Sequence, residues 1–276
     1  MLASNLPDLD LVTALGGSTN YLEHHRGFSH SLLGMPLFAL ALALLLRATL
    51  RGSRLPALLL CSIVGIAGHV FMDLWTSYGT RVLSPFDGRW LTWDLVFIVD
   101  PWILALLLAS ALVLRRSSQA PGIASVGLGL VLAYVGARAV LHAQALDQAR
   151  AQLSGRAVAR IVALPSPVDP FAWRVLADTG DAYWTGPISL RARSGPLVRR
   201  PKQPEDEAVA RARQASEVAS VFLDFSTFPW LEIEPREDGT EVVWRDLRFE
   251  RPGRATFEAR VLVGRDGAIR SQRFRF

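Results

Sequence analysis

The sequence predicts an α-helical membrane domain of about four transmembrane helices, followed by a small soluble α+β domain with a mainly antiparallel sheet. Half of the 276 residues are hydrophobic, which excludes a disordered chain. Only 8 of the 25 acidic residues lie in residues 1–150, and none lies between Glu23 and Asp73. A soluble domain of that size needs more charge to cover its surface. We therefore expect residues 1–150 to lie in a membrane and residues 151–276 to be soluble.

Four apolar stretches in the first half approach the ~20 residues that cross a bilayer as a helix. The expected spans are residues 31–46, 55–75, 95–114 and 122–141. Arg138 lies close enough to the end of the last span for its guanidinium to reach the membrane surface. Cys61, the single cysteine, is expected to be a packing residue, and it excludes an intramolecular disulfide.

Arginines in two short loops predict the orientation. The loops between the first two spans and between the last two spans contain Arg47, Arg51, Arg54, Arg115 and Arg116, and no acidic residue. With four crossings these loops share one side, which the positive-inside rule makes cytoplasmic. The N-terminal segment, the loop 76–94 and the C-terminal domain are then expected outside the cytoplasm.

From about Arg156 the pattern changes to short strand-like runs, separated by turn signals such as Asp238-Gly239 and Asp266-Gly267. One helix is predicted over Glu205–Ser220, because Pro204 stands at its start and alanine is frequent within it. The expected strands are Ala157–Leu164, Trp173–Ala177, Tyr183–Arg191, Leu231–Glu234, Glu241–Phe249, Ala255–Val263 and Ile269–Phe276. This domain contains no nucleophile elbow, P-loop or dinucleotide fingerprint.

The net charge of +5 is compatible with nucleic-acid binding, but the kind and distribution of the charges argue against it. Of the 30 basic residues only Lys202 is a lysine, which is typical of a biased coding composition. In the second half the basic residues are interleaved with acidic ones. We therefore expect no nucleic-acid partner and a lipid bilayer as the main partner.

Side chains that commonly bind metals gather at two places in the membrane half. The first place holds Asp8, Asp10, His25 and His30, and the second holds His69 and Asp73. His69 and Asp73 are four residues apart, so they share one helix face. The first span starts just after His30 and the second ends just after Asp73, so both clusters are expected at the outer face of the bundle.

Imidazole and carboxylate groups together suit a divalent metal ion, zinc or manganese in our prediction. Asp8 and Asp10 are also common helix-capping residues, and His69 and Asp73 could instead join two helices. Ionisable groups inside a span are costly, however, and are usually functional. Arg26 is a candidate for binding an anionic substrate group, because guanidinium pairs well with phosphate.

Four other polar residues are weaker candidates. His24 is a weaker candidate than its neighbour His25, and His142 is expected at the membrane interface. Asp100 with Pro101 could begin a helix. Alternatively, Asp94 and Asp100 could be hydrogen-bond partners of the metal-binding histidines.

Several spaced motifs resemble those of the bacterial YdjM-like membrane proteins, a family described as membrane-bound metal-dependent hydrolases. The run from His25 to Ser31 resembles the family's His-Arg-Gly-x-Thr-His-Ser signature, with Ser29 in place of threonine. The matching elements are residues 6–10, 68–80, 93–94 and 98–101. The resemblance covers residues 1 to about 105 closely and the C-terminal region more weakly. Members usually have an upstream Thr-His pair and a further apolar stretch, so we expect a shortened chain or a misassigned start.

The resemblance implies a metal site made from these residues and a hydrolytic reaction. We expect a metal-dependent hydrolase that acts at the outer membrane face on an ester or phosphoester, with a lipid or envelope component as substrate. Catalytic roles are expected for Asp10, Arg26 and Asp73. The alternatives are a metal-stabilised membrane scaffold whose soluble domain binds an envelope partner and, less well supported, an ion transporter.

Overall fold

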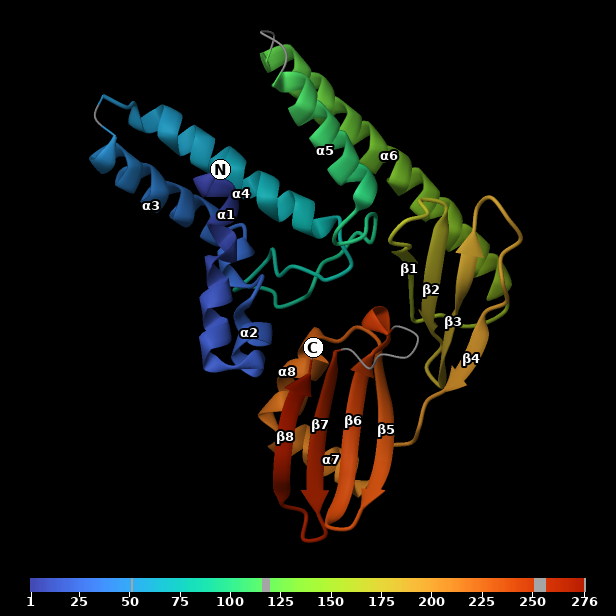
Figure 1. Cartoon of the computed structure of the whole chain (residues 1–276). Helices are drawn as coiled ribbons and strands as arrows, with labels where there is room; N and C mark the ends of the chain where they lie inside the picture. The colour runs from blue at the N-terminus through green and yellow to red at the C-terminus, as the bar shows by residue number, and fades with distance from the viewer. Residues whose placement is uncertain (51, 116–119, 251–256, 276) are drawn as a thin grey trace. The chain divides into compact units, whose positions relative to one another are not determined.

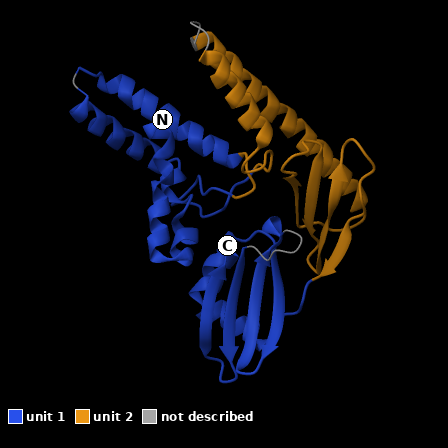
Figure 2. Ribbon diagram, viewed as in Figure 1, with its two compact units in different colours: residues 1–74, 79–92, 202–276 blue, residues 75–78, 93–201 orange. Residues whose placement is uncertain are grey.

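The structure is a computed structural model that describes residues 1–50, 52–115, 120–250 and 257–275 (Figure 1). It divides into two compact units (Figure 2). The first unit comprises residues 1–74, 79–92 and 202–276, and the second comprises residues 75–78 and 93–201. Each unit contains a hairpin of apolar helices and a four-stranded antiparallel sheet.

The helical part of the first unit is built around an antiparallel pair of helices, α3 and α4 (Figure 1). Its elements are α1 (Leu2–Asn5), the 3-10 helix η1 (Pro7–Gly16), α2 (Ser18–His24), the 3-10 helix η2 (Phe28–His30), α3 (Gly34–Thr49) and α4 (Leu55–Leu74). The buried residues of α4 are Ser62, Ile66, Val70 and Asp73, which form one stripe at helical spacing. Its exposed apolar side chains include Leu60, Ile63, Val64, Phe71 and Met72, and an apolar outward surface is expected of a helix in lipid.

The described part of the chain forms two sheets, a first sheet of strands β1 to β4 and a second sheet of strands β5 to β8. The second sheet belongs to the first unit. The strands β5 (Pro229–Arg236), β6 (Gly239–Asp246), β7 (Glu258–Gly264) and β8 (Ile269–Arg275) pair in sequence order. The helices α7 (Glu207–Ala215) and α8 (Glu217–Phe225) cover one face of this sheet (Figure 1). Phe222 and Phe225 of α8 are buried with Val242 and Trp244 of β6, which gives this part its own core.

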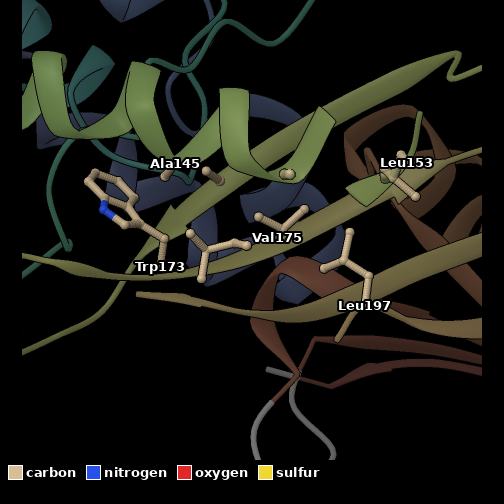
Figure 3. Close-up of a cluster of buried hydrophobic side chains, with 9 residues drawn as sticks. Ala145, Leu153, Trp173, Val175 and Leu197 are labelled. Carbon is tan, nitrogen blue, oxygen red and sulfur yellow. The ribbon is translucent and has the colours of Figure 1, made fainter. Parts of the chain in front are cut away.

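In the second unit, a long helix joins the apolar region to the first sheet. Helix α5 (Pro101–Leu114) pairs with α6 (Ala120–Gln152). The sheet has the order β1 (Arg160–Pro165), β2 (Ala172–Asp178), β3 (Ala182–Ser189) and β4 (Val198–Pro201). Ala145 of α6 and Leu153, directly after the end of α6, pack on Trp173, Val175 and Leu197 (Figure 3). At ~1.5 Å per residue, the 33 residues of α6 are long enough to cross a bilayer and to continue beneath the sheet.

The predicted fold class, a helical membrane region followed by antiparallel α+β structure, is confirmed. Judged by helix length, fewer helices can cross a membrane than the four that the sequence predicts. Among the described residues, two helices are long and apolar enough to cross a membrane: α4 and Pro121–Gln152. A third span is formed by Ser18–His30 together with Gly34–Thr49 if this pair, which is bent by 76°, counts as one. With 14 residues, α5 reaches only about 21 Å. It begins at Pro101 and not at Leu95, because the Asp100 side chain caps it by accepting hydrogen bonds from Trp102 N and Ile103 N.

Other boundaries also differ from the sequence prediction. The two sheets of the region 151–276 belong to different compact units. The predicted helix over Glu205–Ser220 is broken at Ser216, whose hydroxyl caps α8 by accepting from Ala219 N. Strand β4 was not predicted, and residues 247–249 form a 3-10 turn instead of the end of a strand. The predicted positions Arg51, Arg116, Ala255 and Phe276 lie outside the described residues.

Two predictions about single residues in the membrane region were wrong. Cys61 is exposed on α4, so it faces away from the neighbouring helix. Arg138 does not reach the surface, since it is only 1% exposed. Its guanidinium donates to Leu95 O and Pro170 O and lies 4.0 Å from the centre of the Trp173 ring. Two carbonyls and an aromatic face therefore replace the water that a buried cation loses.

This arrangement predicts that Arg138 stabilises the second unit. Replacing Arg138 by Ala removes the charged donor of these two part-buried carbonyl hydrogen bonds, and we expect a loss of about 3 kcal/mol in the free energy of unfolding. An unfolding titration in mixed micelles measures it. The matched control on the same helix is Arg150→Ala. Because the Arg150–Asp147 pair is exposed, that loss should stay near or below about 0.5 kcal/mol. Equal losses in both variants would contradict this account of Arg138.

Candidate metal centre

Three segments of the first unit supply the site residues that the sequence predicted. Helix η1 contributes Asp8 and Asp10, and the last turns of α4 contribute His69 and Asp73. The turn between α2 and α3 contributes the others, His25, Arg26 and His30. All of them belong to the same compact unit.

A tight turn determines where His30 lies. Arg26 has a left-handed backbone, with φ of 58°. Further along, Ser31 Oγ donates to Phe28 O (2.8 Å) and accepts from Gly34 N (2.9 Å). A Cβ at Gly34 would lie 2.0 Å from Phe28 O, so the turn requires glycine at this point. The result is that the His30 side chain is completely buried beside α4.

Two imidazole nitrogens face the same two carboxylate oxygens. His30 Nε2 lies 3.4 Å from Asp8 Oδ1 and 3.3 Å from Asp73 Oδ2. His69 Nε2 lies at the same distances, 3.4 and 3.3 Å, from the same two oxygens. In the part of the chain that the structure describes, neither buried nitrogen has a hydrogen-bond partner. Both nitrogens therefore lie between the same two oxygens.

The spacing of these atoms can be compared with metal coordination. Zinc bonds to histidine nitrogen and carboxylate oxygen are about 2.0–2.1 Å, so neighbouring ligand atoms of a tetrahedral site lie ~3.35 Å apart. The four separations of 3.3–3.4 Å match that value. An octahedral site with bonds near 2.1 Å would bring neighbouring ligands to about 3.0 Å. The donor atoms present and their spacing therefore fit a divalent cation such as zinc, and the ligand atoms of Asp8, His30 and His69 all lie within 4.8 Å of one another.

A second layer of contacts orients His30 from behind. Ser29 Oγ donates to Asp10 Oδ2 (2.5 Å) and lies 2.8 Å from His30 Nδ1. Because a hydroxyl has one proton, and Asp10 accepts it, Ser29 Oγ is the acceptor for an Nδ1–H of His30. In the neutral ring this leaves the lone pair on Nε2, the nitrogen that faces Asp8 and Asp73. A carboxylate that holds the far side of a histidine in this way is typical of metal sites.

Asp10 and Asp73 are themselves held in place. Asp10 Oδ1 lies 2.7 Å from His25 Nδ1, and Asp10 Oδ2 accepts from Arg26 N (3.0 Å). The Arg26 guanidinium lies 2.8 Å from Asp73 Oδ1, which leaves Asp73 Oδ2 to face the two histidines. Arg26 thus joins the two carboxylates, one through its backbone and one through its side chain.

Both carboxylates of η1 are ionised at neutral pH. The pKa of Asp8 lies far below its usual value, because His30 and His69 stabilise its charged form. Burial alone would raise the pKa of Asp10, but hydrogen bonds from His25, His30 and Ser29 outweigh burial and lower it well below normal. Anionic oxygens next to imidazole nitrogens are suitable ligands for a divalent cation.

The structure thus brings Asp8, His30, His69 and Asp73 to one point and places Asp10, His25 and Arg26 directly behind them. Asp94 and Asp100 belong to the second unit, where Asp100 is the cap of α5. His24 is exposed on α2, and His142 lies on α6 beside Trp173. Sequence reasoning missed Ser29 as a functional residue; its position directly before His30 in the motif was the available signal.

The comparisons with known proteins agree with the fold. A sequence profile of the YdjM inner membrane protein family matches residues 1–145. A second profile, for the YfhP C-terminal alpha/beta plait domain, matches residues 207–276. The uncharacterized protein YfhP of Bacillus subtilis is 28% identical over 278 residues, which cover 98% of this chain and 82% of that relative. No solved structure matches the chain.

The first profile covers more than half of the chain and includes every residue of the site described above. The resemblance drawn from the motifs is therefore confirmed. The apolar helices of the structure agree with the family's membrane location. The chain belongs to the YdjM inner membrane protein family.

Proposed function

We propose that this protein is a membrane-bound metal-dependent hydrolase whose metal ion is held by His30, His69 and Asp73, with the carboxylate of Asp8 facing the same point. One observation carries the proposal: two buried imidazole nitrogens face the same pair of carboxylate oxygens at nearly equal distances. Without a cation or extra protons, two lone pairs and two anionic oxygens would repel one another in a poorly hydrated site. Zinc is favoured over manganese, because two of the ligands are imidazole nitrogens, which suit zinc better than manganese.

The other polar residues have positioning roles in this proposal. Asp10 and Ser29 fix the ring of His30, and His25 fixes Asp10. Arg26 fixes Asp73 through their ion pair. The sequence suggested that Asp10 and His25 bind the metal directly and that Arg26 binds substrate; we now propose that these residues act one layer further out.

Hydrolysis is supported by how the ligands are exposed. His30, His69 and Asp73 are nearly buried, whereas the Asp8 side chain is 39% exposed. Two histidines and one carboxylate form the protein ligand set of several catalytic zinc sites. When bound, such an ion lowers the pKa of a coordinated water molecule towards neutrality. The ionised Asp8 lies on the accessible side, where it can accept a proton from an attacking water molecule.

The surroundings of Asp8 favour an ester or phosphoester of a lipid or envelope component as the substrate. Helix η1 turns its carboxylates towards the histidines, while four large apolar side chains on it are exposed: Leu9, Leu11, Val12 and Leu15. An exposed apolar edge of this kind suits contact with acyl chains. The polar part of such a molecule would then lie next to Asp8.

A structural role for the metal is the second candidate. Four protein atoms can fill every position of a tetrahedral zinc site, and closed sites of this kind are typical of structural zinc. In that case the ion joins three segments, namely η1, helix α4 and the turn that precedes α3. The soluble part then binds an envelope partner.

Metal content provides the first test. His30→Ala, His69→Ala and Asp73→Asn each remove one ligand atom and should lower the zinc content of the purified protein to a small fraction of the wild-type content. Asp10→Asn removes only the support of His30, so it should weaken zinc affinity by about 10–100-fold. Plasma mass spectrometry and competition with a chelating dye measure these two quantities.

The matched control is His24→Ala, because His24 belongs to the same segment but is exposed. Its zinc content should equal that of the wild type. Unchanged metal content in the His69 and Asp73 variants would show that the histidine–carboxylate cluster is structural without metal, and the proposed function would fail.

The zinc-loaded protein in vesicles should hydrolyse at least one member of a panel of fluorogenic lipid esters and phosphodiesters. Removal of zinc with a chelator should abolish the activity, and added zinc should restore it. Asp8→Asn should lower kcat more strongly than it lowers zinc content. If the fully loaded protein is inactive across the panel while chelation lowers its Tm, the structural role is supported instead.

We also propose that the C-terminal part lies outside the cytoplasm. The proposal counts the short helix α5 as the fourth crossing, which places the α3–α4 and α5–α6 loops on one side of the membrane. The arginines of these two loops make that side cytoplasmic by the positive-inside rule. Alkaline phosphatase, which is active only outside the cytoplasm, should be active when fused after Phe276. A fluorescent protein that requires the cytoplasm should be dark in the same position, and the opposite pattern would reverse the topology.

A further inference from the structure

A hairpin of the first sheet is joined directly to the start of an apolar helix in the second unit. Trp102 lies in the first turn of α5, and its indole Nε1 donates to Val168 O at 2.8 Å. Val168 lies at the tip of the β1–β2 hairpin. Trp102 is 48% exposed and Val168 is 68% exposed. Two large apolar side chains therefore face outward, and the hydrogen bond from the Trp102 indole to the Val168 backbone joins the two segments that carry them.

The exposed apolar surface is wider than this pair. Ile98 and Val99, directly before the cap residue Asp100, are also exposed. We call Ile98, Val99, Trp102 and Val168 the interface patch. The surface continues along the outward face of α5, where the exposed residues are Leu104, Leu107, Leu108, Leu112 and Val113. The patch is therefore the edge of a surface that already faces lipid.

In the helix pair α5 and α6, polar groups begin next to the interface patch. Asp100 caps α5 and accepts a hydrogen bond from Tyr134 OH on α6 (3.1 Å). One turn beyond Tyr134, Arg138 is buried against Trp173. Tyrosine and tryptophan are enriched where hydrocarbon meets the lipid headgroups, so this level is the natural boundary of the bilayer.

The turn of the hairpin is compatible with such a boundary. The exposed carboxylate of Asp169 is directed back into the turn, where it accepts from Phe171 N at 2.9 Å. The Arg191 guanidinium lies over the ring of Phe171, 3.5 Å from its centre. Guanidinium groups form strong charge-assisted bonds with phosphate, which lipid headgroups supply at this depth.

We propose that the interface patch is a membrane-binding surface whose occupant is the lipid bilayer. The tip of the β1–β2 hairpin and the N-terminal end of α5 lie in the headgroup region. The first sheet is thereby held at the membrane surface by its hairpin as well as by α6. This proposal does not depend on the metal site or on hydrolysis.

The test uses single cysteines in a Cys61→Ser background, labelled with an environment-sensitive fluorophore and reconstituted into phosphatidylcholine–phosphatidylglycerol vesicles. Val168→Cys places the label on the interface patch. Asp181→Cys is the matched control, because its side chain is also 68% exposed and it lies in the turn at the opposite end of β2. Quenching is measured with iodide in the water and with a nitroxide attached near the lipid headgroup.

We expect the label at position 168 to emit at a shorter wavelength than the label at 181, with several-fold weaker iodide quenching and several-fold stronger nitroxide quenching. A label at Val99→Cys should behave like the one at 168. Equal iodide quenching at 168 and 181 would overturn the proposal. Protection from iodide without nitroxide quenching would also overturn it, because a protein, such as a second copy of this chain, would then cover the patch.

Discussion

The burial of His30 between carboxylates is the constraint on which the rest of the first unit depends. A histidine with no exposed surface must have each ring nitrogen matched by a suitable group. The Nδ1 side is matched by Ser29 and Asp10, and the Nε2 side faces Asp8 and Asp73. These partners come from η1, from the turn before α3 and from α4, so three segments distant in the sequence must meet at one ring.

This constraint explains local features that would otherwise be unfavourable. The left-handed backbone of Arg26 is strained for a residue with a side chain. It lets Arg26 N reach Asp10 while the guanidinium reaches Asp73. Gly34 permits the close approach to Phe28 O that turns the chain directly after His30. The backbone geometry on both sides of His30 thus follows from what its ring contacts.

The sequence predicted the convergence of the site because two simple rules were sufficient. Helical spacing placed His69 and Asp73 on one face, and counting spans placed His30 at the same end of the bundle. The sequence did not show which carboxylate faces which ring nitrogen of His30. Asp8 and Asp10 are two residues apart in η1, and only the path of the backbone decides which of them faces Nε2 and which faces Nδ1.

The predicted helices and strands were mostly correct in kind. Their ends differed where a single side chain acts as a cap, as Asp100 and Ser216 do, and the burial of Arg138 depends on carbonyls of distant loops.

Helix α6 passes from the apolar region to the core of the first sheet without a break. A continuous helix bends little, so a change in the tilt of α6 in the bilayer also changes the inclination of the sheet. Helices change tilt when the hydrocarbon thickness around them changes. Lipid composition therefore acts mechanically on this sheet, since a thinner bilayer leans α6 over and inclines the sheet with it.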